Sequence, residues 1–386
     1  MTESTTSTLT IMVSAGEASS DAHAAHALSA LARQGQSFTS FGMGAAALQA
    51  AGTELIVDCR DLAVIGIVDV LINYPKFLKR LRLLRETMRQ NKPDLLLLVD
   101  YPDFNLKLAE TAKEMNIPVL FYVSPQVWAW RAGRVPRIGS LVSHMAVLFP
   151  FEVDIYKKAG IPVTYVGNPV VEDAVSDFSR EQACVHFNQR ADKPLITLLP
   201  GSRTGEIKRN LPVMLETAKL IQAKIPECQF LLPVAPTLDE SFLTEFVNMH
   251  TLSSLNVVNG NSRDAMRAAH VVFAASGTAT LETALIGSPL IVMYIVNPIN
   301  YFIMKRLIKI PDISLVNIVA KKRIVPEYLQ HEAVPEPMAA DLISLLNDEQ
   351  RRTEMLQEIQ TVQTRMGTGG ASAKVATLIE QLATSN

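Results

Sequence analysis

Short apolar runs and helical patterns alternate along the first half of the chain. The apolar runs predict strands at 9–13, 38–41, 95–99, 119–123, 145–148 and 163–166. Several of them are continuously apolar, which is typical of strands covered on both faces of a parallel sheet. The intervening stretches, such as 22–33 and 77–89, have the spacing of amphipathic helices. This alternation predicts a βαβ series.

The second half repeats the rhythm, with strands predicted at 195–199, 229–234, 255–258, 271–274 and 290–296. Two successive series in 386 residues predict an α/β protein with two facing, Rossmann-like, doubly wound parallel-sheet domains and a cleft between them. Gly167 and Pro169 interrupt the pattern at the joint. We therefore expect domains at 1–168 and 169–350, followed by carboxy-terminal helices at 351–386.

The composition narrows the class of protein. A net charge of −2 gives the chain as a whole no electrostatic affinity for nucleic acid. The three cysteines are scattered without metal-site spacing, which favours a reduced protein without structural disulfides. The polar first residues do not resemble a secretory signal, and no apolar run reaches the roughly 20 residues that span a bilayer. These features predict a cytoplasmic protein.

Polar residues follow the ends of five predicted strands. They include Glu17, Ser19 and Asp21 in the first half, then Asp100 and Asp103, the loop 124–134, and in the second half Gly201, Ser202, Arg203, Ser276, Gly277, Thr278 and Glu282. Because ligands bind beyond the carboxyl ends of parallel strands, we expect these loops to line the cleft from both sides. The alternative is that these polar residues are ordinary helix caps and turn residues. This explains any single loop, but it explains less well why such residues recur at the same end of the strands.

The loop after strand 119–123 contains both tryptophans of the chain, Trp128 and Trp130. Two core tryptophans and an aromatic cleft rim explain the sequence of this loop equally well. Basic residues within the same loop fit poorly in a core. We expect the tryptophans to shape the loop, with Gln126 and Arg131 meeting a polar ligand.

The second half carries groups suited to a phosphorylated ligand. Ser276, Gly277 and Thr278 begin a helix whose N–H groups and dipole favour a phosphate. Glu282 can accept hydrogen bonds from a sugar diol, and the alternative is an ordinary solvated glutamate. Arg203 offers a fork of donors for a diphosphate, and the alternative is a surface ion pair.

Asp100 is the candidate general base, because it ends an apolar strand where partial desolvation raises carboxylate basicity. Asp103 is better explained as a helix cap. The residues from Gly42 match a loose GxGxxA pattern, but it follows the second strand and no ribose-binding acid follows it, so a dinucleotide site is disfavoured. No metal motif is present, so we expect no cofactor or metal.

A local basic and apolar surface is predicted around a helix at 77–89. Its basic residues include Lys76, Lys79, Arg80, Arg82 and Arg85, and a second apolar and basic stretch contains Lys305 and Arg306. Such helices suit the surface of an anionic membrane. The alternative is an ordinary helix packed on its sheet with a solvated basic face. The recurrence of the pattern favours an amphiphilic substrate.

The chain resembles the lipid-A-disaccharide synthases, which are inverting glycosyltransferases of the GT-B type. The resemblance covers nearly the whole chain and rests on the motifs Gly16-Glu17-Ala18-Ser19-Ser20-Asp21, Ala63-Val64-Ile65-Gly66-Ile67-Val68, Asp100-Tyr101-Pro102-Asp103-Phe104-Asn105, Ser124-Pro125-Gln126-Val127-Trp128-Ala129-Trp130-Arg131, Leu199-Pro200-Gly201-Ser202-Arg203 and Ala275-Ser276-Gly277-Thr278-Ala279-Thr280-Leu281-Glu282. The tryptophan motif is highly specific, whereas the last two motifs are shared more widely among GT-B enzymes.

The resemblance implies transfer of 2,3-diacylglucosamine from UDP-2,3-diacylglucosamine to 2,3-diacylglucosamine 1-phosphate, in lipopolysaccharide biosynthesis. The products would be a β-1,6-linked disaccharide 1-phosphate and UDP. The first domain would serve the acceptor and the membrane, the second would bind the donor, and the carboxy-terminal helices would pack back on the first. The enzyme would be peripheral on the cytoplasmic face of the inner membrane, and a homo-oligomer is compatible with the sequence.

By motif position, Asp100 would be the base, and Arg203, Glu282 and Asn317 would face the donor. Ser19 would lie on the acceptor side. The chain departs from the family pattern at Ser20, where glycine is usual, and at Val316, where proline is frequent. A UDP-N-acetylglucosamine 2-epimerase and a nucleotide-sugar-binding protein are the alternatives, and the basic amphipathic surface disfavours the epimerase.

Overall fold

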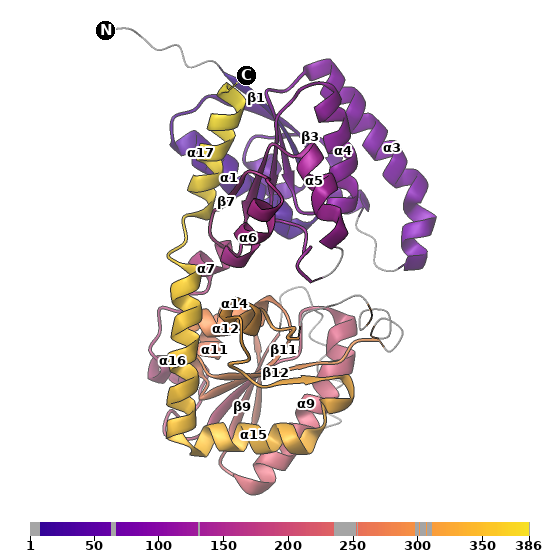
Figure 1. Ribbon diagram of the computed structural model, residues 1–386. Coiled ribbons are helices and arrows are strands. Elements are labelled where there is room, and N and C mark those ends of the chain that lie inside the picture. Colours follow the sequence, from indigo (N-terminus) through magenta and orange to yellow (C-terminus); the bar gives the residue numbers. More distant parts are fainter. Residues whose placement is uncertain are drawn as a thin grey trace, which may run out of the picture. The chain divides into compact units, whose positions relative to one another are not determined.

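The computed structural model describes residues 8–62, 67–129, 132–234, 252, 254–297, 301, 306 and 311–385, and within these it leaves out the side chains of 61, 62 and 67–73. The chain divides into two compact units (Figure 1). The first unit contains Met1–Pro169 and Thr368–Asn386, and the second contains Val170–Gly367.

The first unit is built on a parallel sheet of seven strands in the order β3-β2-β1-β4-β5-β6-β7. Its strands are β1 (Leu9–Ala15), β2 (Phe38–Gly44), β3 (Glu54–Asp58), β4 (Leu95–Val99), β5 (Val119–Tyr122), β6 (His144–Val147) and β7 (Val163–Tyr165). Its helices are α1 (Ala18–Arg33), α2 (Ala46–Ala50), α3 (Ile67–Asn91), α4 (Pro102–Glu114), α5 (Val135–Leu141), α6 (Pro150–Lys158) and α17 (Ala371–Thr384), with 3-10 turns η1 (Cys59–Leu62) and η2 (Ala132–Arg134). Helix α7 (Pro169–Asp173) begins where the second unit does.

The second unit has a parallel sheet of six strands in the order β10-β9-β8-β11-β12-β13. These are β8 (Leu195–Leu199), β9 (Gln229–Val234), β10 (Leu255–Asn259), β11 (Val271–Ala275), β12 (Leu290–Tyr294) and β13 (Glu327–Leu329). The helices are α8 (Arg180–His186), α9 (Thr204–Lys224), α11 (Ser262–Ala268), α12 (Thr278–Ile286), α14 (Leu315–Ala320), α15 (Pro335–Asn347) and α16 (Glu349–Met366), with the 3-10 turn η3 (Gln330–Glu332).

Side chains of β4 alternate between two cores on opposite faces of the first sheet. Leu96 and Leu98 belong to a cluster that includes residues of α3 and α4. Leu95 and Leu97 belong to a second cluster with residues of α1 and α17. All five residues of β4 are buried, as a strand covered on both faces requires. The apolar runs of the sequence therefore lie where they were predicted.

The carboxy-terminal helices differ from the single unit expected at 351–386. Helix α16 belongs to the second unit, whereas α17 belongs to the first and packs against α1 (Figure 1). The break between them contains Gly367, Gly369 and Gly370, all with positive φ. Glycine reaches this conformation without steric cost, so the chain can turn sharply here.

Candidate functional site

Each sheet has one point where the strand order reverses, between β1 and β4 in the first and between β8 and β11 in the second. Loops diverge at such a point and leave room for a ligand beyond the carboxyl ends of the strands. The loops there begin at Gly16 and Asp100 in the first unit, and at Pro200 and Ser276 in the second. Four of the five loops picked out from the sequence thus adjoin these two points, and the tryptophan loop follows β5, the neighbour of β4.

Asp100 lies at the end of β4 in a strained backbone. Its φ is +50° and that of Tyr101 is +46°, a left-handed conformation that is uncommon for residues other than glycine. Burial and, to a lesser extent, the nearby charge of Glu17 raise the pKa of the Asp100 carboxyl to about 6, against the lowering effect of a hydrogen bond from the Tyr101 backbone. Consecutive strained residues around a perturbed carboxyl are a frequent feature of active sites.

The acids of the first loop have different environments. Glu17 and Ser19 are exposed. Asp21 is buried, and its carboxylate accepts from the backbone N–H groups of Ala45 at 2.6 Å and Ala47 at 2.9 Å. The expected acceptor-side position of Asp21 is thus replaced by a cap on helix α2.

This cap also accounts for the loose dinucleotide pattern, because the Asp21 carboxylate occupies the helix start that a phosphate would need. Gly42 serves packing, since a Cβ there would lie 1.9 Å from the backbone oxygen of Val13. Ser20 lies within α1 without positive φ. The loop therefore keeps its shape without the glycine usual in the family.

Asp103 also differs from its expected role. The N-cap of α4 is Tyr101, and no side chain caps it. Asp103 instead pairs with Arg134 of η2 at 2.6 Å. This ion pair joins the loop after β4 to the end of the tryptophan loop.

The tryptophan loop begins with Val123 at φ +65°, which is strained for a β-branched residue. Gln126 is exposed, and Trp128 is half-buried, with its ring edge-on to Phe151 at 5.3 Å between centroids. Trp130 and Arg131 lie outside the described residues. Trp128 thus packs against Phe151 and also lies in a surface loop.

A buried polar cluster supports this loop, and sequence reasoning missed it. Glu152 of α6 is 2% exposed, and its Oε2 accepts from the Phe149 backbone at 3.0 Å. Burial raises its pKa to about 7, although the Phe149 backbone N–H and the nearby polar groups of Ser124 and Trp128 favour the charged form. The Trp128 Nε1 is close enough to lower that pKa but lacks good hydrogen-bond geometry. The glutamate sits inside an ordinary amphipathic helix pattern, so no sequence signal distinguishes it.

The second unit has a pocket of about 440 Å³ at its switch point. Residues lining it include Gly201, Ser202, Arg203, Gly277, Thr278 and Glu282. Ser276 lines it too, so the structure brings together seven of the eight donor-side residues predicted from sequence. A pocket of this size can hold a nucleotide or a nucleotide sugar in part.

The two loops of this pocket use their polar groups differently. Arg203 is 80% exposed, and its Nη1 lies 3.4 Å from the Glu206 carboxylate. Gly201 has φ +118°, and a Cβ there would lie 2.7 Å from Glu206, so glycine permits the close approach of loop and helix. The exposed guanidinium is only weakly held, which leaves it available to an anion.

Ser276 is engaged by the protein itself. Its N–H donates to Met293 at 3.0 Å, and its hydroxyl donates to the Ile313 backbone oxygen at 3.1 Å. Gly277 and Thr278 are exposed at the start of α12, where no side chain caps the helix. Of the three predicted phosphate ligands, Gly277 and Thr278 thus present backbone donors. Glu282 is 19% exposed and lies 3.5 Å from Arg263.

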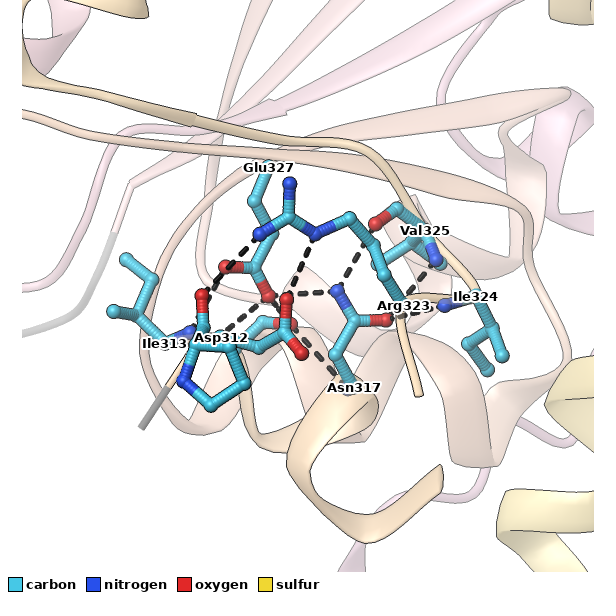
Figure 2. A network of polar contacts seen from close by, with 9 residues as sticks. Asp312, Ile313, Asn317, Arg323, Ile324, Val325 and Glu327 are labelled. Atoms are coloured by element: carbon cyan, nitrogen blue, oxygen red, sulfur yellow. Dashed lines mark hydrogen bonds and ion pairs between the residues drawn. The ribbon is translucent and has the colours of Figure 1, made fainter. Parts of the chain in front are cut away.

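Asn317 does not present its side chain to the pocket as expected. It is fully buried, and its amide nitrogen donates to Val325 at 3.0 Å and to Glu327 at 2.7 Å (Figure 2). Its amide oxygen accepts from the backbone of Ile324 at 2.8 Å and Val325 at 3.0 Å. These contacts use both donors and both acceptor sites of the amide.

Glu327 is the centre of this network and was not predicted from sequence. It is 6% exposed and accepts from the backbone of Ile313 at 2.9 Å, from the backbone and hydroxyl of Ser314 at 3.0 and 2.5 Å, and from Asn317. Because Ile313 also accepts from Ser276, the network ties the 312–317 segment to the pocket. A glutamate in a three-residue edge strand carries no sequence signal for this role.

The basic helix α3 divides into a packed and an exposed part. Leu81, Leu84 and Met88 are buried against the sheet, and Arg85 donates to the Lys107 backbone of α4 at 2.5 Å. Arg85 therefore holds α3 to α4 instead of facing outward. The side chains exposed on this helix include Lys76, Lys79, Arg82, Tyr74 and Leu78, whereas Arg80 is half-buried.

The remaining predicted features lie partly outside the described residues. Residues 63–66 of one family motif and Lys305 fall there, whereas Arg306 is described and exposed. Among the helices that the structure describes, none has the length and apolarity needed to cross a bilayer. Within the same part of the chain, no three His, Cys, Asp or Glu side chains gather closely enough to hold a metal ion.

Solved structures share this architecture. UDP-N-acetylglucosamine 2-epimerase from Neisseria meningitidis, bound to UDP-N-acetylglucosamine, is similar with a TM-score of 0.64 at 12% identity, covering 97% of this chain and 100% of the other. MurG from Acinetobacter baumannii is similar with a TM-score of 0.59 at 15% identity over 97% and 100% of the two chains. At these identities the likeness shows the fold alone, and it confirms the predicted two-domain α/β fold.

Sequence relatives go further. A family model described as lipid-A-disaccharide synthetase matches residues 11–379. The lipid-A-disaccharide synthase of Nitrosococcus oceani is 43% identical over 359 residues, which cover 93% of this chain and 92% of the relative. That of Syntrophus aciditrophicus is 41% identical over 368 residues, covering 95% and 96%. The chain belongs to the lipid-A-disaccharide synthetase family.

Proposed function

We propose that the protein is a lipid-A-disaccharide synthase that transfers 2,3-diacylglucosamine from UDP-2,3-diacylglucosamine to 2,3-diacylglucosamine 1-phosphate. The observation that carries the chemistry is Asp100, a largely buried carboxyl with a pKa near 6 at the switch point of its sheet. A carboxylate of this basicity is mostly ionised at neutral pH and still accepts a proton readily.

In the proposed step, the acceptor 6-hydroxyl oxygen attacks the anomeric carbon of the donor. The bond from that carbon to the diphosphate oxygen breaks, and its electron pair leaves with UDP. The hydroxyl proton passes to the Asp100 carboxylate. A single displacement inverts the anomeric carbon, which yields the β-1,6 linkage.

The second unit would bind the leaving group. Arg203 supplies positive charge to the diphosphate, and the backbone N–H groups at the start of α12 donate to its oxygens. Glu282 accepts hydrogen bonds from the ribose diol, once it exchanges its contact with Arg263 for the ligand. The sequence offers no metal motif, and we propose that these groups meet the developing charge without a metal ion.

The test supplies both lipid substrates in detergent and follows the products by mass spectrometry. The proposal predicts the disaccharide 1-phosphate and one UDP for each disaccharide formed. Arg203→Ala should raise the donor KM, whereas Lys224→Ala, a basic change at the far end of the same helix, should leave it unchanged. Absence of the disaccharide with the unaltered protein would contradict the function.

We also propose that the exposed part of α3 contacts the anionic membrane that carries these lipids. Lys76, Lys79 and Arg82 lie beside Tyr74 and Leu78, which are 47% and 43% exposed. Near such a surface each basic residue contributes about 1 kcal/mol. The combination of exposed basic and apolar side chains supports peripheral binding.

Sedimentation with phosphatidylglycerol vesicles tests this contact. Replacing Lys76, Lys79 and Arg82 together by glutamine should reduce the bound fraction at low salt. The matched control replaces Lys157 and Lys158, exposed at the end of α6, and should bind as the unaltered protein does. Equal binding of the triple variant would overturn the membrane proposal.

A further inference from the structure

Asn105 is a fully buried side chain of α4 whose amide reaches two strand ends at once. Its Nδ2 lies 2.7 Å from the Asp100 backbone oxygen, 3.3 Å from that of Val99 and 3.2 Å from that of Ser14. Its Oδ1 accepts from the Ser14 hydroxyl at 2.6 Å. The two hydrogens of the amide are thus shared among three carbonyl groups.

These contacts lie at the switch point of the first sheet. Ser14 pairs with Leu98, and Ala15 pairs with Val99, so Asn105 bridges the last residues of two neighbouring parallel strands. The loop with Glu17 continues from one strand, and the loop with Asp100 continues from the other. Asn105 therefore holds together the starts of the two loops that carry these acids.

The backbone that Asn105 binds is the strained part of the loop. Asp100 and Tyr101 are both left-handed, a conformation that is unfavourable for residues other than glycine. The Asp100 N–H donates to Tyr122 of β5 at 3.0 Å, and its carbonyl oxygen accepts from Asn105. The two peptide groups that flank Asp100 are thus fixed by a neighbouring strand and by the Asn105 amide.

Gly16 completes the arrangement from the other loop. A Cβ at this position would lie 2.3 Å from the Tyr101 ring, so the two loops touch directly. A change in the Asn105 contacts would move Asp100 relative to Glu17 as well as to the sheet. Both the burial of the Asp100 carboxyl and its distance from the Glu17 carboxylate would change.

We propose that Asn105, oriented by Ser14, is a positioning residue that holds the Asp100 carboxylate in place for proton abstraction. The inference rests on the proposed role of Asp100 as the base. Asn105 acts through the main chain and does not touch substrate. Displacement of a reacting group by about 1 Å lowers rates by roughly 100-fold, so fixing this backbone has a large effect on turnover.

The experiment compares Asn105→Ala and Ser14→Ala for kcat, donor KM and the pH dependence of kcat/KM. Asn105→Ala should lower kcat on the order of 10- to 100-fold with the donor KM unchanged. The pH below which kcat/KM of this variant declines (the acid limb) should move below 6. A loosened loop admits water to Asp100, which lowers the pKa of its carboxyl. Ser14→Ala keeps the amide donors and should change kcat in the same direction by less.

Two controls separate positioning from folding. Asn256→Ala removes an amide that donates to the Phe187 backbone at 2.9 Å in the second unit, and it should leave kcat and the acid limb unchanged. UDP binding, measured by titration calorimetry, should be the same in Asn105→Ala as in the unaltered protein. If Asn105→Ala does not fold, Ser14→Ala carries the test alone.

A double-variant cycle with Asp100→Asn distinguishes this inference from the role of the base. If Asn105 acts only through Asp100, then Asn105→Ala should cause little further loss in the Asp100→Asn background. Full additivity of the two losses would overturn the positioning role. An unchanged kcat and acid limb in Asn105→Ala and in Ser14→Ala, alongside an inactive Asp100→Asn, would overturn it and leave the base assignment intact. Near-native turnover by Asp100→Asn would instead refute the base, and the inference with it.

Discussion

Among single residues, Asp100 shows how burial and one neighbouring charge raise the pKa of a carboxyl. Burial is the larger cause of its raised pKa, and Glu17 is the second. A carboxyl with a raised pKa loses its charge as the pH falls through about 6. We therefore expect the proposed base to be ionised at neutral pH and protonated in acid.

Removing the charge of Glu17 should lower the pKa of Asp100, because the ionised form no longer faces a like charge. Glu17→Gln should then shift the acid limb of kcat/KM to lower pH, although not to the ordinary aspartate value, since burial persists. Glu380→Gln, an exposed change on α17, is the control. A limb that stays in place for Glu17→Gln would show that the two acids do not interact.

Sequence alone did not distinguish polar residues that face the site from polar residues that stabilise the fold. Asp100, Asp21 and Asn317 all have short polar side chains, and all were assigned to the site. The structure leaves Asp100 at a switch point, whereas the Asp21 carboxylate caps α2 and the Asn317 amide is saturated by main-chain and Glu327 contacts. The sequence shows where a polar side chain stands, but it does not show whether hydrogen bonds within the protein already engage that side chain.

At the scale of elements, the strands with apolar runs were predicted, including the edge strands β7 and β10, whereas the edge strands β3 and β13 were not. Strands β3 and β13 lie at sheet edges, and each includes a glutamate, Glu54 and Glu327. An edge strand is covered less completely, so its sequence need not be apolar. The network around Glu327 was missed for this reason.

Glu327→Gln should loosen the segment that holds Ser276. The carboxylate accepts four hydrogen bonds, and an amide would turn an N–H₂ group toward some of these donors. Leaving buried donors unpaired costs about 1–3 kcal/mol each. We expect a lower melting temperature and weaker UDP binding by titration calorimetry.

Glu332→Gln, exposed in the adjacent turn η3, should change neither quantity. Lower stability of Glu327→Gln with unchanged UDP affinity would show that the network supports the fold without shaping the pocket.

At the scale of the whole molecule, the duplication of the α/β pattern was predictable, but the division of the carboxy-terminal helices was not. Alternating strands and helices indicated two sheets, and each sheet has its own switch point. Helices α16 and α17 each bury one apolar face, and helical periodicity alone does not say which sheet each one covers. The glycine-rich break at 367–370 marks the division.

The two units carry different groups. The first unit contains the proposed base and the basic helix α3, and the second contains the pocket that we propose for UDP. The net charge of −2 hides this arrangement, because the basic residues of α3 are offset elsewhere in the chain. Composition alone therefore did not reveal the local basic surface.

The most direct test of the central claim is the rate of disaccharide formation by Asp100→Asn, measured across pH with both lipid substrates. The unaltered protein should lose kcat/KM below about pH 6. The variant, which keeps the shape of the side chain but not its basicity, should be slower on the order of 10²–10⁴-fold. Near-native turnover by Asp100→Asn, with the same acid limb, would contradict the account.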